Sequence, residues 1–163
     1  MTRLRWVLCA VAIHGCGAPQ APPQAAVRCP ERDGSAAAAV IDDLYAAFRT
    51  DDAVAASQLF APDFVAFDGG KRVDGPGLIA LVKKAHDDGK QIVWNVIPPQ
   101  IQTACDIAWL VWENRGSITD ASGTTDIVWN ESAVLRWTDR GWRLALFHSS
   151  RAVADKPAPR EAK

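Results

Sequence analysis

The chain has 163 residues, of which 48% are hydrophobic and 23% charged, a globular composition that argues against a disordered chain or a repeat array. The formal net charge is −1, with lysine and arginine spread along the chain, so a nucleic-acid binder has little support. Two features remain to be explained: four cysteines, and seven tryptophans, most of them in the second half.

The first residues have the layout of an export signal. Arg3 and Arg5 precede a short apolar run over residues 6–13, which is too short to span a bilayer as a helix. The sequence Ile-His-Gly-Cys follows at residues 13–16 and resembles a bacterial lipobox, in which the cysteine is acylated and becomes the mature N-terminus.

This resemblance implies a lipoprotein signal peptide over residues 1–15 and lipidation of Cys16. We therefore expect the protein to be anchored to a membrane of the bacterial cell envelope and to face the periplasm. An ordinary signal peptide, cleaved after Ala18 or Ala21, is the alternative and would release a secreted protein.

One domain is expected between a tether and a tail. Residues 16–34 contain four prolines together with glutamine, alanine and glycine, a composition typical of an extended spacer. Residues 153–163 contain two further prolines and alternating charges, and they are expected to form a disordered tail. The folded domain is therefore predicted over residues 35–152.

The first half of this domain has helical patterns. Apolar residues recur at helical spacing over residues 35–49, with Ser35 as the expected cap and Tyr45 at the border of the apolar stripe. A second, short helix is expected from a cap at Thr50 to residue 59. Pro76 is expected to start a third helix that ends near residue 85.

The remaining elements are predicted strands. A short strand is expected at residues 64–68, followed by four longer ones at 91–102, 107–118, 124–138 and 142–150. The connections between the long strands are short and polar, as antiparallel hairpins require, and Pro98 and Pro99 interrupt the first. Helices followed by an antiparallel meander predict an α+β fold.

Two cysteines remain for the folded domain, because Cys9 leaves with the signal peptide and Cys16 takes the lipid. A disulfide between Cys29 and Cys105 and a pair of free thiols are both open, since an oxidising compartment permits the bond. No two cysteines have metal-binding spacing and only two histidines follow the signal, so neither a metal nor a cofactor is expected.

The strand faces single out a few residues. On the third long strand, Glu131 shares a face with five apolar residues, and on the fourth His148 shares a face with Trp142, Leu144 and Leu146. The second long strand is apolar on both faces. Helices cover only one face of such a sheet, so this pattern favours a homodimer through the other.

An acid on an apolar face needs a hydrogen-bonding partner, or its pKa rises until it can carry a proton. Glu131 is therefore a candidate general acid or base, or a ligand anchor; the alternatives are a bulge that turns it outward or an ion pair with Arg115 or Arg136. His148 is a candidate catalytic residue or a core histidine, and Tyr45 could point its hydroxyl into a cavity.

Three segments resemble the SnoaL-like branch of the nuclear transport factor 2-like superfamily. They are the run LFAPDFVAFDGG at residues 59–70, the Asp-Gly pair that opens the third helix, and the ending GWRLALFHSS at residues 141–150. The ending is also similar to the association domain of calcium/calmodulin-dependent kinase II. The resemblance implies a cystatin-like cone, three N-terminal helices packed into a curved antiparallel sheet, with a pocket at the open end and a dimer formed through the sheet. Isomerases, cyclases, dehydratases and oligomerising hubs share this fold.

Our main functional hypothesis is a membrane-tethered domain that binds a small apolar or carbonyl molecule. The expected pocket walls are Trp94, Trp112, Trp129 and Leu146, and the polar contacts are Glu131, His148 and Tyr45. The alternatives are an isomerase, cyclase or dehydratase that moves a proton with Glu131 or His148, and a module that only dimerises.

Overall fold

The structure is a computed structural model that describes residues 29–153, so the signal peptide, Cys16, most of the tether and nearly all of the tail lie outside the described residues. The helices are α1 (Gly34–Arg49), α2 (Ala53–Gln58) and α3 (Gly75–Asp87). The strands are β1 (Phe60–Asp68), β2 (Lys71–Val73), β3 (Gln91–Val96), β4 (Gln100–Ala104), β5 (Ile107–Asp120), β6 (Gly123–Thr138) and β7 (Gly141–Arg151).

All three expected helices form, but an aspartate caps each of them. The carboxylates of Asp33, Asp52 and Asp74 accept hydrogen bonds from backbone N–H groups in the first turns of α1, α2 and α3. The expectation that Ser35 and Thr50 are the caps is therefore wrong. A carboxylate accepts the N–H and also complements the positive end of the helix dipole, so aspartate serves well at this position.

The sheet has the order β2-β1-β7-β6-β5-β3, and β4 also pairs with β5. The predicted meander is confirmed for β5, β6 and β7, whereas the predicted strand at 91–102 divides around Pro98 and Pro99 into β3 and β4. The sheet is mixed rather than wholly antiparallel, because β1 runs parallel to β7. These two strands are far apart in the sequence, so no hairpin turn fixes their relative direction.

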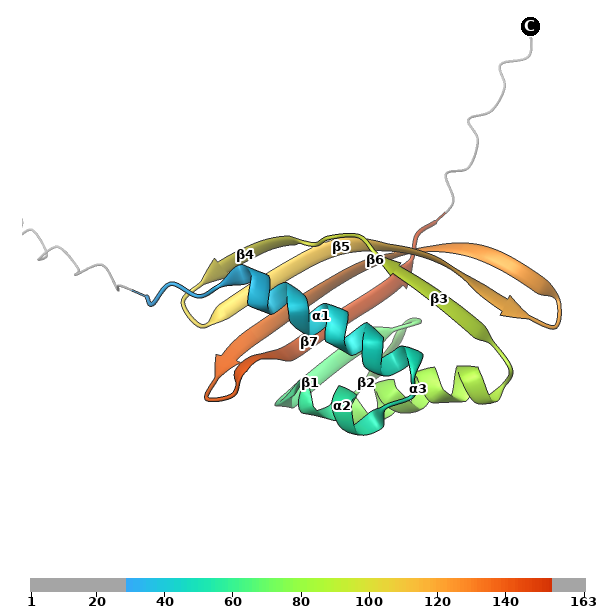
Figure 1. Cartoon of the computed structure of the whole chain (residues 1–163), viewed down its shortest axis with the longest axis horizontal. Helices are drawn as coiled ribbons and strands as arrows, with labels where there is room; N and C mark the ends of the chain where they lie inside the picture. The colour runs from blue at the N-terminus through green and yellow to red at the C-terminus, as the bar shows by residue number, and fades with distance from the viewer. Residues whose placement is uncertain (1–28, 154–163) are drawn as a thin grey trace, which may run out of the picture.

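The helices lie on one face of the curved sheet and enclose the core against it (Figure 1). Leu110, Leu135 and Leu144 on β5, β6 and β7 are fully buried on this inner face, where Ile41 of α1 and Leu78 of α3 are also buried. The opposite, outer face carries half-exposed apolar side chains. No helix among residues 29–153 is both long enough and apolar enough to cross a membrane.

A β-bulge in β7 changes which residues face the core. Leu144 pairs with Leu135, but the next pair joins Leu146 to Val134, so the strand gains one residue at this point. Beyond the bulge Phe147 is buried and His148 is exposed. The prediction that Leu146 and His148 share the inner face with Leu144 is therefore wrong.

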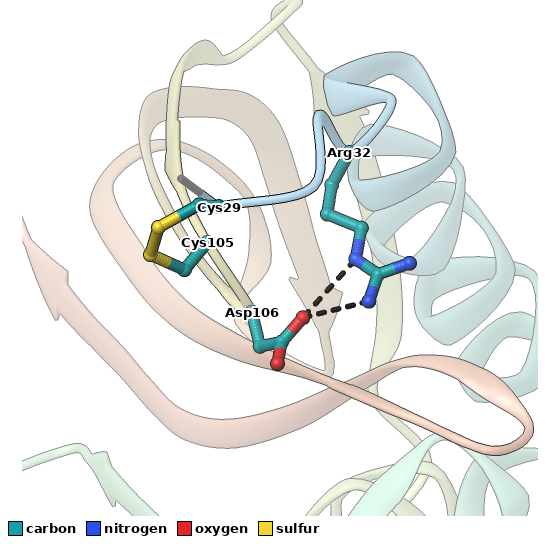
Figure 2. Close-up of a disulfide and its surroundings, with 4 residues drawn as sticks. All are labelled: Cys29, Arg32, Cys105 and Asp106. Atoms are coloured by element: carbon teal, nitrogen blue, oxygen red, sulfur yellow. Dashed lines mark hydrogen bonds and ion pairs between the residues drawn. A yellow bond between two sulfur atoms is a disulfide. The ribbon is translucent and has the colours of Figure 1, made fainter. Parts of the chain in front are cut away.

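Cys29 and Cys105 form a disulfide, which decides between the two alternatives that the sequence left open (Figure 2). The bond joins the segment before α1 to the β4–β5 turn, with 4.6 Å between the two Cα atoms. Beside it, Arg32 forms an ion pair with Asp106 at 2.8 Å and lies over the ring of Trp137 at 4.4 Å. The end of the tether is thus fixed to the sheet by the disulfide and by the ion pair of Arg32 with Asp106.

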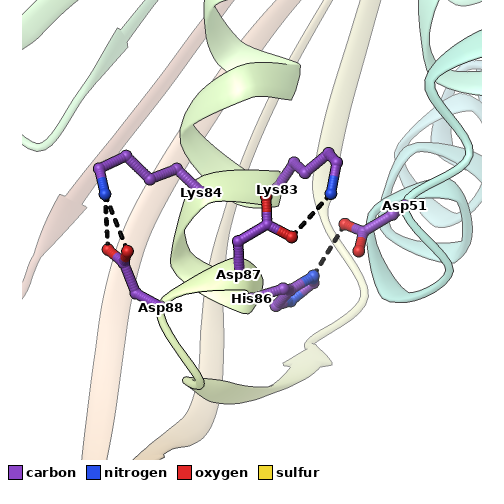
Figure 3. Close-up of polar contacts among 6 residues, drawn as sticks. All are labelled: Asp51, Lys83, Lys84, His86, Asp87 and Asp88. Carbon is purple, nitrogen blue, oxygen red and sulfur yellow. Dashed lines mark hydrogen bonds and ion pairs between the residues drawn. The ribbon is translucent and has the colours of Figure 1, made fainter.

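A histidine connects α3 to the turn after α1. His86 Nδ1 lies 2.8 Å from a carboxylate oxygen of Asp51, a residue with a left-handed backbone at φ 52° (Figure 3). The ring of His86 also packs edge-on against Trp94 at a centroid distance of 6.0 Å. The end of α3 is therefore held beside both α1 and β3. The neighbouring Lys–Asp pairs on α3 are exposed and contribute little stability.

Candidate functional site

A cavity of about 580 Å³ lies between the inner face of the sheet, α1 and α3, a size typical of sites for small molecules. Five aromatic side chains line it: Tyr45, Phe48, Trp94, Trp129 and Phe147. Aliphatic side chains of α3, β3 and β5 complete the apolar wall: Leu81, Val82, Ala85, Ile92 and Ile118. The ionisable lining residues are Asp68, Lys90, Glu131 and Arg151 in addition to the tyrosine.

A buried polar group, which we call the Glu131 cluster, consists of Tyr45, Asn114, Glu131 and Ser149. The hydroxyls of Tyr45 and Ser149 both donate to Glu131 Oε1, at 2.6 Å and 2.9 Å. The amide Nδ2 of Asn114 donates to Glu131 Oε2 at 3.3 Å. Glu131 is 5% exposed and Asn114 is fully buried. Three donors from α1, β5 and β7 thus converge on one carboxylate of β6.

Strand register explains this convergence. Glu131 pairs with Trp112 of β5 on one side and with Ser149 of β7 on the other. If the register at Leu144 continued without the bulge, His148 would lie opposite Glu131; the additional residue puts Ser149 there instead. The bulge therefore gives the carboxylate a hydroxyl as its neighbour in place of an imidazole.

Burial controls the ionisation of the two acids in the cavity. Loss of solvation raises the pKa of Glu131, while the hydrogen bonds from Tyr45, Ser149 and Asn114 and the N–H of Trp112 act against this rise. Burial and the negative charge of Glu131 raise the pKa of Tyr45 well above its ordinary value. Burial also raises the pKa of Asp68, against the effects of the Gly69 backbone N–H and of nearby positive charges. Glu131 can therefore take up a proton more readily than an exposed glutamate can.

Two polar atoms beside the carboxylate have no hydrogen-bonding partner among the residues described: Asn114 Oδ1 and Trp112 Nε1. The indole N–H is near enough to lower the pKa of Glu131, but it meets no acceptor with the geometry of a hydrogen bond. Buried polar atoms are nearly always paired in folded proteins, so two unpaired atoms beside one carboxylate need an explanation.

The structure brings four of the candidate residues together. Tyr45, Trp94, Trp129 and Glu131 all line the cavity. The two alternatives considered for Glu131 do not apply: it faces inward, and the two arginines pair with other acids, Arg115 with Glu113 and Arg136 with Asp63.

The other three candidates lie elsewhere. Trp112 is buried behind the cavity wall and packs against Phe147 at a centroid distance of 6.2 Å. Leu146 and His148 lie on the outer face, where His148 borders a separate hollow with Val111. The side chains of Glu131 and His148 therefore lie on opposite faces of the sheet, and the structure does not bring them together as a catalytic pair.

Asn114 and Ser149 also contribute to the site, although neither was among the candidates predicted from the sequence. Asn114 had a detectable signal, because it follows Leu110 and Trp112 on the inward face of the same strand. Ser149 had none, since only the bulge turns it inward. Among the residues described, no three histidine, cysteine, aspartate or glutamate side chains are grouped closely enough to hold a metal ion.

Comparison with known proteins agrees with this architecture. The family of SnoaL-like domains matches residues 37–155, which are most of the chain and include all of the Glu131 cluster. The chain belongs to the SnoaL-like domain family. No curated protein matches this SnoaL-like domain.

Solved structures with the same fold have diverse descriptions. The CaMKII hub of S. rosetta has 22% identity and a TM-score of 0.61, with 76% of this chain and 99% of the hub covered. A putative ketosteroid isomerase from Shewanella frigidimarina has 19% identity and a TM-score of 0.60, covering 71% and 94%. A Mycobacterium tuberculosis protein of unknown function has 16% identity and a TM-score of 0.64, covering 77% and 79%. At these identities the likeness shows the nuclear transport factor 2-like fold alone.

Proposed function

We propose that this SnoaL-like domain binds a small, mostly apolar molecule inside its cone. The observation that carries the proposal is the cavity of about 580 Å³, which has aromatic and aliphatic walls and a single buried carboxylate cluster. Protein cores are normally packed to the density of organic crystals, so open space of this size is not required for folding. Apolar walls with a few placed polar groups are typical of small-molecule sites.

A cavity-filling variant tests this proposal. Ala85 lines the cavity from α3, whereas Ala80 of the same helix is exposed. We expect the neutral apolar dye N-phenyl-1-naphthylamine to bind the unmodified protein with increased fluorescence. Ala85→Phe should abolish the increase and Ala80→Phe should leave it unchanged. Equal dye binding by both variants, or none by the unmodified protein, would refute the proposal.

We also propose that the domain is tethered to a membrane of the bacterial envelope through Cys16. The support comes from the positive and apolar residues 3–13 before this cysteine and from the Cys29–Cys105 disulfide, a bond favoured in oxidising compartments. Cys16→Ser should move the protein from the membrane fraction to the soluble fraction, with Cys9→Ser as the matched control. A Cys16→Ser protein that remains acylated and membrane-bound would exclude this anchor.

Proton transfer beside a carbonyl is a second candidate function, supported by the raised pKa of Glu131 and by its position in the cavity wall. In this role Glu131 would remove a proton from the carbon next to a carbonyl and return it to another atom. The assay is deuterium exchange into an apolar ketone, followed by NMR. Glu131→Gln should abolish the exchange, whereas enzyme-dependent exchange that persists in this variant would exclude Glu131 as the base.

We further propose that two copies of the domain associate through the outer face of the sheet, whether or not the cavity is occupied. Trp109 and Val111 of β5, Val128 of β6 and Phe67 of β1 lie on this face and are 37–46% exposed. Apolar residues gathered in this way favour association with a similar surface. Val111→Glu should convert a dimer to a monomer in sedimentation velocity, while Val54→Glu, on the exposed side of α2, should not. A monomeric unmodified protein would exclude the dimer.

A further inference from the structure

The carboxylate of Glu131 has no cationic partner in the part of the chain that the structure describes. None of the ion pairs formed among residues 29–153 includes Glu131, although the side chain is almost fully buried. Its three neighbours in the Glu131 cluster are neutral hydroxyl and amide groups. A buried carboxylate is normally stabilised by a cation in addition to hydrogen bonds.

The other charged residues of the cavity form no ion pair among residues 29–153 either, but each of them has an opposite charge near enough to act on it. Burial raises the pKa of Asp68, and the positive charge of Arg151 acts against this rise. Hydrogen bonds from Lys84 and Ser122 lower the pKa values of Asp88 and Asp120, and the positive charge of Lys90 lowers both further. Asp68, Lys90 and Arg151 therefore each have a residue of opposite charge nearby, whereas no positive charge is among the groups that act on Glu131.

The carboxylate also retains capacity to accept a hydrogen bond. Oε1 accepts from two hydroxyls, which uses both of its lone pairs, but Oε2 accepts only the long bond from Asn114. Asn114 Oδ1 is a second acceptor with no donor. The free capacity of the cluster is therefore for a ligand that donates hydrogen bonds. The unpaired donor beside it, Trp112 Nε1, belongs to a side chain that does not line the cavity, so a ligand carbonyl would find no free hydroxyl in the cluster to bind.

The walls favour the same kind of ligand. Tyr45 contacts both Phe48 and Trp94, at centroid distances of 6.0 Å and 5.7 Å, and Trp129 and Phe147 line the cavity as well. Aromatic faces attract organic cations through the negative charge above each ring, and this attraction strengthens where water is excluded. Aromatic rings next to a carboxylate therefore favour the binding of an ammonium group.

From the aromatic walls, the buried carboxylate without a cation and its free acceptor atoms, we propose that the cavity binds a lipophilic amine, with the ammonium group against Glu131 and the apolar body along the aromatic side chains. The inference rests on the proposed function, because it requires that the cavity bind a small molecule, and it specifies the chemistry of that molecule.

Three probes with the same phenylethyl body and different head groups test this inference: 2-phenylethylamine, 2-phenylethanol and 3-phenylpropanoate. Isothermal titration of the full chain at neutral pH should give at least about tenfold tighter binding for the amine than for the alcohol, and the weakest binding for the carboxylate. The comparison uses the unmodified protein, so it does not depend on whether a variant folds.

A matched pair of variants then locates the ammonium group. Glu131→Gln keeps the shape of the side chain and removes its charge, so it should reduce the preference for the amine over the alcohol to less than about threefold. Glu113→Gln removes a carboxylate from the outer face of the adjacent strand and should leave the preference unchanged.

The outcomes separate the two proposals. If N-phenyl-1-naphthylamine binds in the cavity but the alcohol or the carboxylate matches the amine, the amine inference is overturned and the apolar site stands. The inference is equally overturned if Glu131→Gln retains the full preference for the amine. If neither the dye nor any of the probes binds, both proposals fail.

Discussion

Removal of the Cys29–Cys105 disulfide should lower the free energy of unfolding by about 2–4.5 kcal/mol. The two cysteines are 76 residues apart, and closing a loop of this length in the unfolded chain costs about 4.5 kcal/mol of conformational entropy at 25 °C in the chain-entropy model. Measured values fall below this limit where other contacts or residual structure intervene. The ion pair of Arg32 with Asp106 remains after the bond is cut, so the segment keeps part of its attachment.

Urea unfolding followed by tryptophan fluorescence measures this effect. Cys29→Ser and Cys105→Ser should lower the urea midpoint equally, and the double variant should unfold like either single variant, because all three lack the same bond. A reductant should lower the midpoint of the unmodified protein to that of the variants and leave the variants unchanged. The reasoning is refuted if the midpoints of all four proteins coincide, or if the two single effects add.

Three further predictions concern the cavity and the sheet. Folding raises the pKa of Glu131, so this group stabilises the folded state below its ordinary pKa of 4.5, and the stabilisation is lost as pH rises through the folded pKa. Glu131→Gln should therefore make the unfolding free energy fall less steeply with pH, and an unchanged slope would contradict this. Ser149→Ala removes a hydrogen-bond donor to Glu131, so it should raise the pKa of Glu131 further in a carbon-13 NMR titration, and His148→Ala should have a smaller effect. A larger effect of His148→Ala would mean that β7 does not have its bulge before these residues. Gly116→Ala would put a Cβ atom 1.8 Å from the backbone carbonyl oxygen of Val93, so β3 would have to move away from β5. We expect the unfolding free energy to fall by about 3 kcal/mol or more in urea unfolding, and a loss below about 1 kcal/mol would exclude this close approach.

Part of the site could be predicted from the sequence of single strands and helices. Glu131 and Trp129 share an inward face because side chains alternate along β6, and the helical spacing of residues 40–48 puts Tyr45 beside the apolar stripe of α1. These periodicities are local properties of the backbone, so they predict which way each residue points relative to its own neighbours.

The hydrogen bonds of Ser149 and Asn114 to Glu131 could not be predicted from single strands. Ser149 faces inward only because β7 contains a bulge, and the fully buried Asn114 is recognisable as a partner only once β5 and β6 are in register. A shift of one residue exchanges the two faces of a strand, so a single bulge moved Leu146 and His148 out of the site.

The sequence by itself determined the three helices, the antiparallel strands β5, β6 and β7, and the apolar inner face of β6, because spacing of 3.6 or 2 residues follows from backbone geometry alone. It also determined the concentration of tryptophans, three of which, Trp94, Trp112 and Trp129, are buried in the core of the domain. Only the tertiary structure decided that β1 runs parallel to β7, that Cys29 pairs with Cys105, and that a hydroxyl rather than an imidazole faces Glu131. Each of these depends on contacts between segments far apart in the chain, whose relative position is set by packing of the whole domain.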